Sequence, residues 1–311
     1  WVSPALVAAH IEVDGQDLDY ESAHATYFAE PGILRQQFTI GTLVVELTLH
    51  YETSKRAVII AKIDNQGERP VSVRANWGGA TFSEQDRFTM QEFGVALTTP
   101  GGDRVSVFSP DHQASTDRNQ YLLEQLEPRQ VAAQSVEFFP VTVLLGKDES
   151  SVHIDAASSL AAREQRWTEY KSAIATGHAT THPQQILADK ALMTLVSNWR
   201  SPRGGLTVDG LFPSSAVSYF NGFWAWDSWK HAVALARFNP ELAKQQVRTM
   251  FEHQNDRGMV ADVVYVDSSE DNWRDSKPPL AGWAVEEILE RDGDLIFAAE
   301  IYPKVVNYHR W

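Results

Sequence analysis

Two short segments of the chain combine aromatic rings with groups that form strong hydrogen bonds. The segment Tyr219–Lys230 reads Tyr-Phe-Asn-Gly-Phe-Trp-Ala-Trp-Asp-Ser-Trp-Lys, and the segment Asp271–Pro279 reads Asp-Asn-Trp-Arg-Asp-Ser-Lys-Pro-Pro. Sugar hydroxyls need charged or amide partners, and the carbon faces of a sugar ring need flat apolar cover. Such charges are costly in a packed core unless they are paired. The mixture therefore predicts a site for a polyhydroxyl ligand.

Each charged residue in these segments also has an ordinary structural interpretation. Asp227 could be the N-cap of the helix that follows it, because Asp is favoured at that position. Lys277 and Arg274 could be solvated loop charges. Asp262 and Asp267 flank an apolar Val-Val-Tyr-Val run and could face either a cleft or water. The sequence alone leaves these alternatives open.

Composition excludes several other classes of protein. The 311 residues carry 41 acidic and 27 basic side chains, a formal net charge of −14, and a nucleic-acid partner would instead require a basic face. The absence of cysteine excludes disulfides, zinc–thiolate sites and cysteine nucleophiles. The chain has no G-x-S-x-G, H-E-x-x-H, P-loop or G-x-G-x-x-G motif and no cluster of His at ligand spacing. No apolar run is long enough to span a membrane. We therefore expect no membrane, nucleic-acid, metal or cofactor partner.

The elements that must position the two segments change type along the chain. Up to about residue 155, short β-branched runs separated by turn residues predict an antiparallel β-sandwich. A helical period is suggested in this half only around Tyr121–Leu126. The predicted strands are Leu43–Tyr51, Ala57–Ile63, Val71–Trp77, Gly94–Thr99, Arg104–Ser109, Gln134–Phe139 and Val141–Leu145.

Helical periodicity replaces this pattern after about Ser158. Asn239-Pro240 begins one of the helices, with Asn239 as N-cap and Pro240 at the first helical position. Successive helices without intervening strands indicate a helical toroid or bundle. The predicted helices are Leu160–Tyr170, Gln184–Trp199, Asp227–Phe238, Pro240–Gln254, Pro278–Arg291 and Asp294–Trp311.

Six segments of this second half carry a resemblance to a known family. By their order and spacing, the chain from about Gln165 onward resembles glycoside hydrolase family 63, and within it the bacterial YgjK-type α-glucosidases. The Trp-Asp element and the later Lys-Pro-Pro loop are also similar to trehalases and glucoamylases, which share the barrel. The segments are Gln165–Tyr170, Asn198–Pro202, Trp224–Lys230, Ala236–Pro240, Asn272–Trp283 and Tyr302–Lys304.

The resemblance implies a β-sandwich followed by the opening helices of an (α/α)6 catalytic barrel. With the change in periodicity, it places the sandwich over residues 1–155, a helical linker over 156–183 and the first part of the barrel over 184–311. It also implies hydrolysis of α-glucosidic bonds with inversion, which needs a carboxylic acid and a carboxylate base about 6.5–9.5 Å apart. The family's acid lies in an E-S-G-x-D motif and its base is a late Glu, and the 311 residues contain neither motif. We therefore expect no catalytic carboxylate in this chain, a fragment whose acid and base follow Trp311.

The resemblance also implies residues for the sugar site. Asp227 corresponds to the family's Asp that binds the glucose hydroxyls at the cleavage subsite. Trp273 and Lys277 correspond to the family's second pocket loop. The remaining substrate-binding candidates are Trp226, Trp224, Phe223 and Asn221 in the first loop, the last two by proximity, and Trp273 and Lys277 in the second loop.

The sequence thus predicts part of an inverting α-glucosidase that acts on α-linked gluco-oligosaccharides or disaccharides, with this chain supplying one wall of the glucose subsite. Two alternatives are a trehalase-like or glucoamylase-like hydrolase and a non-catalytic carbohydrate-binding fragment. The expected partners are the saccharide and the remainder of the catalytic barrel, in the same or a separate chain. The sequence leaves the compartment open between the bacterial periplasm and the cytoplasm.

Overall fold

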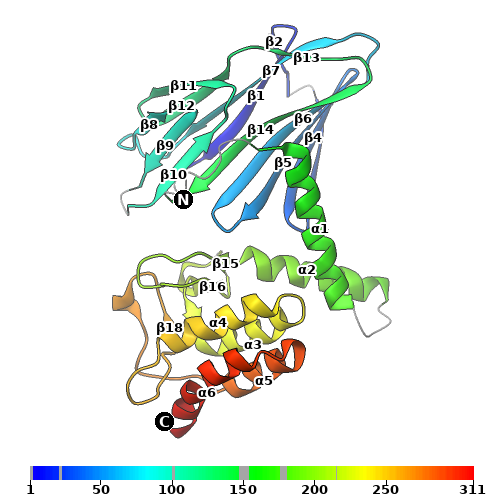
Figure 1. Cartoon of the computed structure of the whole chain (residues 1–311). Coiled ribbons are helices and arrows are strands. Elements are labelled where there is room, and N and C mark those ends of the chain that lie inside the picture. The colour runs from blue at the N-terminus through cyan, green and yellow to red at the C-terminus, as the bar shows by residue number, and fades with distance from the viewer. Residues whose placement is uncertain (1–2, 21–22, 100–101, 147–153, 176–180, 215) are drawn as a thin grey trace. The chain divides into compact units, whose positions relative to one another are not determined.

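The computed structural model describes residues 3–20, 23–99, 102–146, 154–175, 181–214 and 216–311. The chain divides into two compact units, Trp1–Gln165 and Arg166–Trp311, whose elements are labelled in Figure 1. The division falls within helix α1, which spans Ala156–Ala175. The predicted limits at residues 155 and 183, with a separate linker between them, remain a prediction.

The amino-terminal unit is built from two antiparallel sheets. The first sheet has the order β11-β12-β7-β1-β2, with β13 also paired to β7, and the second has the order β3-β4-β5-β6-β14-β10-β9-β8. The strands of the first sheet are β1 (Ala5–Val13), β2 (Gln16–Asp17), β7 (Val71–Ala80), β11 (His112–Asp117), β12 (Gln120–Gln125) and β13 (Arg129–Val131). Those of the second are β3 (His24–Glu30), β4 (Ile33–Ile40), β5 (Leu43–Thr53), β6 (Arg56–Asn65), β8 (Phe88–Gln91), β9 (Gly94–Thr98), β10 (Arg104–Phe108) and β14 (Ser135–Leu145).

One apolar core joins these two sheets. Trp77 of β7 and Phe139 of β14 come from different sheets, are almost completely buried and belong to the same cluster. Alternate residues of a strand point to opposite faces, so each sheet contributes every second side chain to this layer. The arrangement confirms the predicted sandwich-like pair of sheets.

Two details of the β prediction were wrong. Tyr121–Leu126 does not form a helix, because Gln120–Gln125 is strand β12 with buried and exposed side chains in strict alternation. Its pairing with β7 overrides the helix preference of Leu, Glu and Gln. The two strands predicted on either side of Pro140 are one strand, β14, in which Pro140 lies opposite Ile60.

The carboxy-terminal unit contains helices linked by small two-stranded ribbons. The described residues of the whole chain form six α-helices, which agrees with the predicted change from strands to helices. After α1 the elements are α2 (His182–Ser197), β15 (Trp199–Arg200), β16 (Gly210–Leu211), η1 (Ser218–Phe220), β17 (Phe223–Trp224), α3 (Ala225–Ala236), α4 (Pro240–Glu252), β18 (Val263–Val264), η2 (Ser268–Glu270), α5 (Ala281–Asp292) and α6 (Leu295–Arg310). None of the helices in the described part of the chain is long and apolar enough to cross a membrane.

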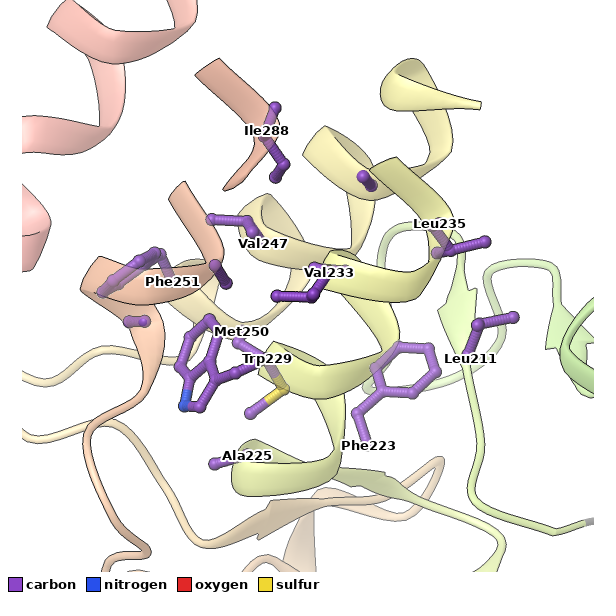
Figure 2. Close-up of a cluster of buried hydrophobic side chains, with 14 of the residues drawn as sticks. Leu211, Phe223, Ala225, Trp229, Val233, Leu235, Val247, Met250, Phe251 and Ile288 are labelled. Carbon is purple, nitrogen blue, oxygen red and sulfur yellow. The ribbon is translucent and has the colours of Figure 1, made fainter. Parts of the chain in front are cut away.

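Helix α3 forms the centre of this unit, where it packs against α4 and α5. Its buried residues recur at helical spacing, from Ala225 through Trp229 to Ala236, while Trp226 and Lys230 lie on the exposed side. Figure 2 shows Trp229 and Phe223 within the apolar cluster that fills the space between these helices. The core therefore fixes the helix whose first turn carries Asp227.

Side-chain caps set the beginnings of the next helices. Asn239 accepts a hydrogen bond from the Leu242 amide at 3.2 Å, with Pro240 at the first helical position, which confirms the predicted start of α4. Asp294 accepts from the Ile296 and Phe297 amides, both at 3.0 Å, at the start of α6. The barrel that these helices would open remains a prediction.

Candidate sugar-binding site

A short β-ribbon brings together the two segments that the sequence singles out. Phe223 and Trp224 of β17 pair with Val264 and Val263 of β18, and Val263 forms a further bridge with Asn272. After strand β17 the first segment continues directly into α3. The second segment contacts the ribbon through Asn272. Residues about 50 positions apart in the chain thus become neighbours on one scaffold.

Asp227 is the third residue of α3 and not its N-cap. The helix begins at Ala225 with Trp224 at the cap position, and among the described residues no side chain caps this end. The capping alternative for Asp227 is therefore wrong. Burial raises the pKa of Asp227 above its ordinary value, and Asp262 adds to the rise, whereas Lys230 and Lys277 oppose it. Because burial outweighs both lysines, the fold holds Asp227 where its charge is incompletely compensated.

Asp262 is the most deeply buried acidic residue of this site, with 3% of its surface exposed. Its Oδ2 accepts a hydrogen bond from the Asn272 side-chain amide at 3.0 Å and lies 3.3 Å from the Lys277 ammonium. Its Oδ1 is buried and has no hydrogen-bond partner among the described residues. Among the residues described, the Asp262 carboxylate therefore binds the second loop through Oδ2 alone.

Lys277 is paired and is not a freely solvated loop charge, although its side chain is 36% exposed. Its ammonium lies 5.9 Å from the centre of the Trp224 ring, a cation–π distance. The Tyr308 hydroxyl of α6 donates a hydrogen bond to the Lys277 carbonyl at 3.2 Å, which anchors the loop backbone. These contacts place Lys277 next to Asp262 and Trp224, with an electrostatic influence on Asp227.

The aromatic candidates occupy different environments. Trp224 is 9% exposed and is flanked edge-on by the rings of Tyr219 and Phe220, at 5.1 and 5.8 Å between centroids. Trp226 and Trp273 are exposed by 37% and 39% and could offer a ring face to a ligand. The site therefore combines one sheltered tryptophan with two open ones.

Phe223 lies in the apolar core. It is completely buried, packs edge-on against Phe212 at 5.0 Å, and its ring leaves no room for a Cβ at Gly210. A sugar could not reach this ring without a rearrangement, so Phe223 positions the ribbon and we leave it out of the proposed contact surface. Asn221 is exposed in the connection between η1 and the ribbon.

Sequence reasoning did not assign Asp262, Tyr219 or Phe220 to the site. Tyr219 and Phe220 belong to the first segment, and their aromatic character beside Trp224 was the available signal. For Asp262 the signal was a single charge inside the otherwise apolar run Met259–Val264. That pattern marks a buried charge but does not identify its partner, which the fold brings from Lys277.

The described residues contain no group of three or more His, Asp or Glu side chains arranged to hold a metal ion. The site instead contains charged hydrogen-bonding groups and aromatic rings that can stack on a sugar. Asp227 can accept hydrogen bonds from hydroxyls and Lys277 can donate them, both beside flat rings. This chemistry suits a neutral polyhydroxyl ligand.

Comparison with known proteins finds a family match for the segment that contains the candidate residues. Residues 219–311 match the family model of the mannosylglycerate hydrolase MGH1-like glycoside hydrolase domain. Two mannosylglycerate hydrolases of Selaginella moellendorffii, MGH2 and MGH1, are each 27% identical to the chain, over 52% of its length and 35% of theirs. The chain thus spans about a third of the length of these curated relatives.

The fold is also similar to that of a solved structure described as a kojibiose phosphorylase from the human microbiome. The similarity covers 96% of this chain and 48% of the other, with a TM-score of 0.56 and 8% identity. Identity this low shows a shared fold alone. All the candidate residues from Asn221 to Lys277 lie within the segment that matches the glycoside hydrolase domain. The segment 219–311 is therefore similar to part of a glycoside hydrolase domain, and the assignment to the YgjK-type α-glucosidases remains a prediction.

Proposed function

We propose that the carboxy-terminal unit forms part of the catalytic domain of a glycoside hydrolase and that the start of α3 binds a glycosyl ring. The observation that carries the proposal is the cluster of Asp227, Lys277 and Asp262 beside Trp224. This cluster lies within the segment that the glycoside hydrolase model matches. A buried charge such as that of Asp262 is expensive to maintain, which favours a functional role for the cluster over a purely structural one.

In this proposal each group has a distinct task. The ionised Asp227 carboxylate accepts hydrogen bonds from two neighbouring hydroxyls, and such charge-assisted bonds are stronger than neutral ones. The Lys277 ammonium donates to an adjacent ring oxygen. Trp226 and Trp273 cover the apolar faces of the saccharide, since both rings are accessible. The proposed contact surface is therefore Asp227, Lys277, Trp226 and Trp273, and the sheltered Trp224 ring lies beside the Lys277 ammonium.

The reaction we propose is inverting hydrolysis of an α-glucosidic bond. The general acid and base would come from residues outside these 311, because the expected motifs are not in this sequence. The described unit would form one wall of the subsite, and the remainder of an (α/α)6 barrel would supply the rest. The proposed substrates are α-linked gluco-oligosaccharides or disaccharides.

A second candidate substrate is mannosylglycerate. The family model and both curated relatives are named for hydrolysis of that compound. This similarity favours mannose as an alternative sugar and glycerate as an alternative leaving group. Glucose and mannose differ only in the configuration at C2. A carboxylate such as Asp227 that binds hydroxyls elsewhere on the ring would accept either sugar.

The test is to incubate the native protein that contains this chain with separate substrates and to follow the anomers by NMR. The substrates are α-linked glucosyl disaccharides, trehalose, malto-oligosaccharides and mannosylglycerate. We expect preferred turnover of an α-linked glucosyl disaccharide other than trehalose, with release of the β-anomer. Preferred turnover of trehalose or malto-oligosaccharides would favour the trehalase-like or glucoamylase-like alternative, and turnover of mannosylglycerate alone would favour the second candidate. Saccharide binding without turnover would favour the binding fragment, and neither binding nor turnover would contradict the proposal.

A further inference from the structure

Two hydrogen bonds fix the backbone of Asp262. The Asp262 carbonyl accepts a hydrogen bond from the Ala225 amide at 2.9 Å, and the Asp262 amide donates to the Asn272 carbonyl, also at 2.9 Å. One bond ties it to the first turn of α3 and the other to the second loop. The side chain therefore begins from a fixed point between the two segments that carry the proposed sugar contacts.

Burial makes this carboxylate costly unless it serves a partner. An ionised carboxylate removed from water needs a counter-charge or several hydrogen bonds. In the described part of the chain it has one amide donor, Asn272, and one cation, Lys277, both on Oδ2. The Oδ1 atom is buried without a partner. Stability alone does not explain why one oxygen of a buried carboxylate has no partner.

Lys277 depends on Asp262 for its position. The lysine side chain is long, flexible and 36% exposed, so its backbone anchor to Tyr308 does not fix the ammonium. The ion pair with Asp262, at 3.3 Å, is the salt bridge that holds the ammonium among the described residues. Without it, the ammonium would gain rotamer freedom and move into solvent.

We propose that Asp262 is a positioning residue of the sugar site, an inference that rests on the proposed function. Its carboxylate holds the Lys277 ammonium beside Trp224 and near Asp227, so that Lys277 donates to a ring oxygen while Asp227 accepts from the neighbouring hydroxyls. The Lys277 ammonium then lies near both the Asp262 and Asp227 carboxylates on the proposed sugar-binding surface. Such a surface matches a neutral saccharide whose oxygens act as both donors and acceptors.

The substitution Asp262→Asn separates this role from a purely structural one. An Asn carbonyl oxygen can still accept the hydrogen bond from Asn272, and it keeps the shape of the side chain. The substitution removes the negative charge that attracts the Lys277 ammonium. The structural role thus predicts little effect from Asp262→Asn, whereas the positioning role predicts a loss that depends on the presence of Lys277.

The experiment is a double-mutant cycle in the native protein, with Asp262→Asn, Lys277→Met and the combination. kcat and KM are measured on the glucosyl disaccharide that the native protein hydrolyses best, together with thermal unfolding. We expect Asp262→Asn to lower kcat/KM by about 10-fold or more, and to lower it by less than about 3-fold when Lys277 is already Met, because contacting residues couple strongly. Asp267→Asn is the matched control, since this exposed Asp flanks the same apolar run and its side chain accepts hydrogen bonds from Ser269 and not from the site. It should leave kcat/KM unchanged.

Equal losses from Asp262→Asn in both backgrounds would overturn the proposal, as would native kcat/KM in the single variant. A second measurement keeps the test independent of the proposed function. The rate at which an amine-acylating reagent modifies Lys277, relative to Lys230, should rise about 3-fold or more in Asp262→Asn. If the native protein binds and hydrolyses no glycoside, the proposed function fails while this rate still reports the ion pair. An unchanged labelling ratio would overturn the positioning role itself.

Discussion

The Lys230 ammonium lies 3.2 Å from the centre of the Trp226 ring, four residues earlier on the same exposed side of α3. One face of this tryptophan is therefore occupied by a cation, which leaves the opposite face for a ligand. The same lysine opposes the rise in the pKa of Asp227. Lys230 thus links the stacking surface of the proposed site to its carboxylate.

The first prediction concerns Trp226. Replacing Trp226 by Leu should weaken saccharide binding by about 3–10-fold, because an aromatic contact is worth roughly 0.5–1.5 kcal/mol beyond the area it buries. Isothermal titration of the native protein with its preferred saccharide measures this change. Trp283→Leu is the matched control, since Trp283 is similarly exposed, on α5, and donates to Glu287 instead. Equal affinities for the two variants would remove Trp226 from the site.

A second prediction concerns the ion cluster around Lys244. The Lys244 ammonium lies 2.9 Å from Glu241, 3.0 Å from Asp292 and 2.9 Å from Asp294, and so ties α4 to the α5–α6 junction. We expect Lys244→Met to lower the melting temperature of the protein by about 3–6 °C at neutral pH. The more exposed pair of Lys171 and Asp189, at 3.0 Å, provides the control, and Lys171→Met should have a smaller effect.

The effect of Lys244 should depend on pH in a defined direction. Its hydrogen bond lowers the pKa of Asp294, so this part of the stability is present above the ordinary pKa of Asp and is lost as the pH falls through the lowered value. The carboxylates raise the pKa of Lys244, so the stability is also lost as the pH rises through that raised value. Melting curves of the native protein and Lys244→Met should therefore converge at strongly acidic pH. A constant difference down to pH 2 would contradict this explanation.

A third prediction concerns a buried amide between three elements. Gln246 of α4 is completely buried, donates to the Ser228 hydroxyl at 2.9 Å and accepts from the Leu211 amide at 2.5 Å. Gln246→Leu would leave both partners unsatisfied, which should cost about 2–4 kcal/mol of unfolding free energy. Denaturant unfolding measures the loss, with Gln245→Leu at the partly buried neighbouring position as control. Equal stability of the two variants would show that the network contributes little.

The sequence was most informative where local chemistry acts alone. The cap formed by Asn239 and Pro240 depends on residues within one turn, and the structure agrees with it. The segment Tyr121–Leu126 shows the opposite case, because its side chains favour a helix while pairing with β7 makes Gln120–Gln125 a strand. Pairing with a distant strand is not encoded in a six-residue window.

The site was predictable in part for the same reason. The two aromatic, charged segments could be recognised from their composition, whereas the pairing of Asp262 with Lys277 depends on the ribbon that joins β17, β18 and Asn272. Phe223 is adjacent to Trp224 in sequence but points into the core, because successive residues of a strand face opposite sides. Proximity in the chain was therefore a poor guide to contact with a ligand.

A fourth prediction concerns the isolated chain. We expect the purified 311 residues to show no turnover of α-glucosides, because we propose that the general acid and base lie outside them. Each such group is typically worth about 10²–10⁴-fold in rate. A coupled glucose assay with the native protein as positive control measures this. Clear turnover by the 311 residues would mean that the catalytic carboxylates lie within this sequence.

The fifth prediction concerns Asp227→Asn in the native protein. Its raised pKa means that the fold disfavours the ionised carboxyl, so the cost in stability is present above the raised pKa and is relieved as the pH falls through it. Asn removes this charge and keeps the shape. We therefore expect the variant to be at least as stable as the native protein at neutral pH.

Activity should change in the opposite direction from stability in the same variant. Asn loses the negative charge and one hydrogen-bond acceptor for the sugar hydroxyls, and hydrogen bonds to charged groups contribute about 1.5–3 kcal/mol. Binding energy that orients the ring is also used in the transition state, so kcat/KM should fall by about 10–100-fold. In the native protein, kcat/KM should also fall as the pH drops through the raised pKa of Asp227, and the variant should lack this dependence. Steady-state kinetics across pH and thermal unfolding at neutral pH measure both effects, and native kcat/KM in Asp227→Asn would remove Asp227 from the sugar site.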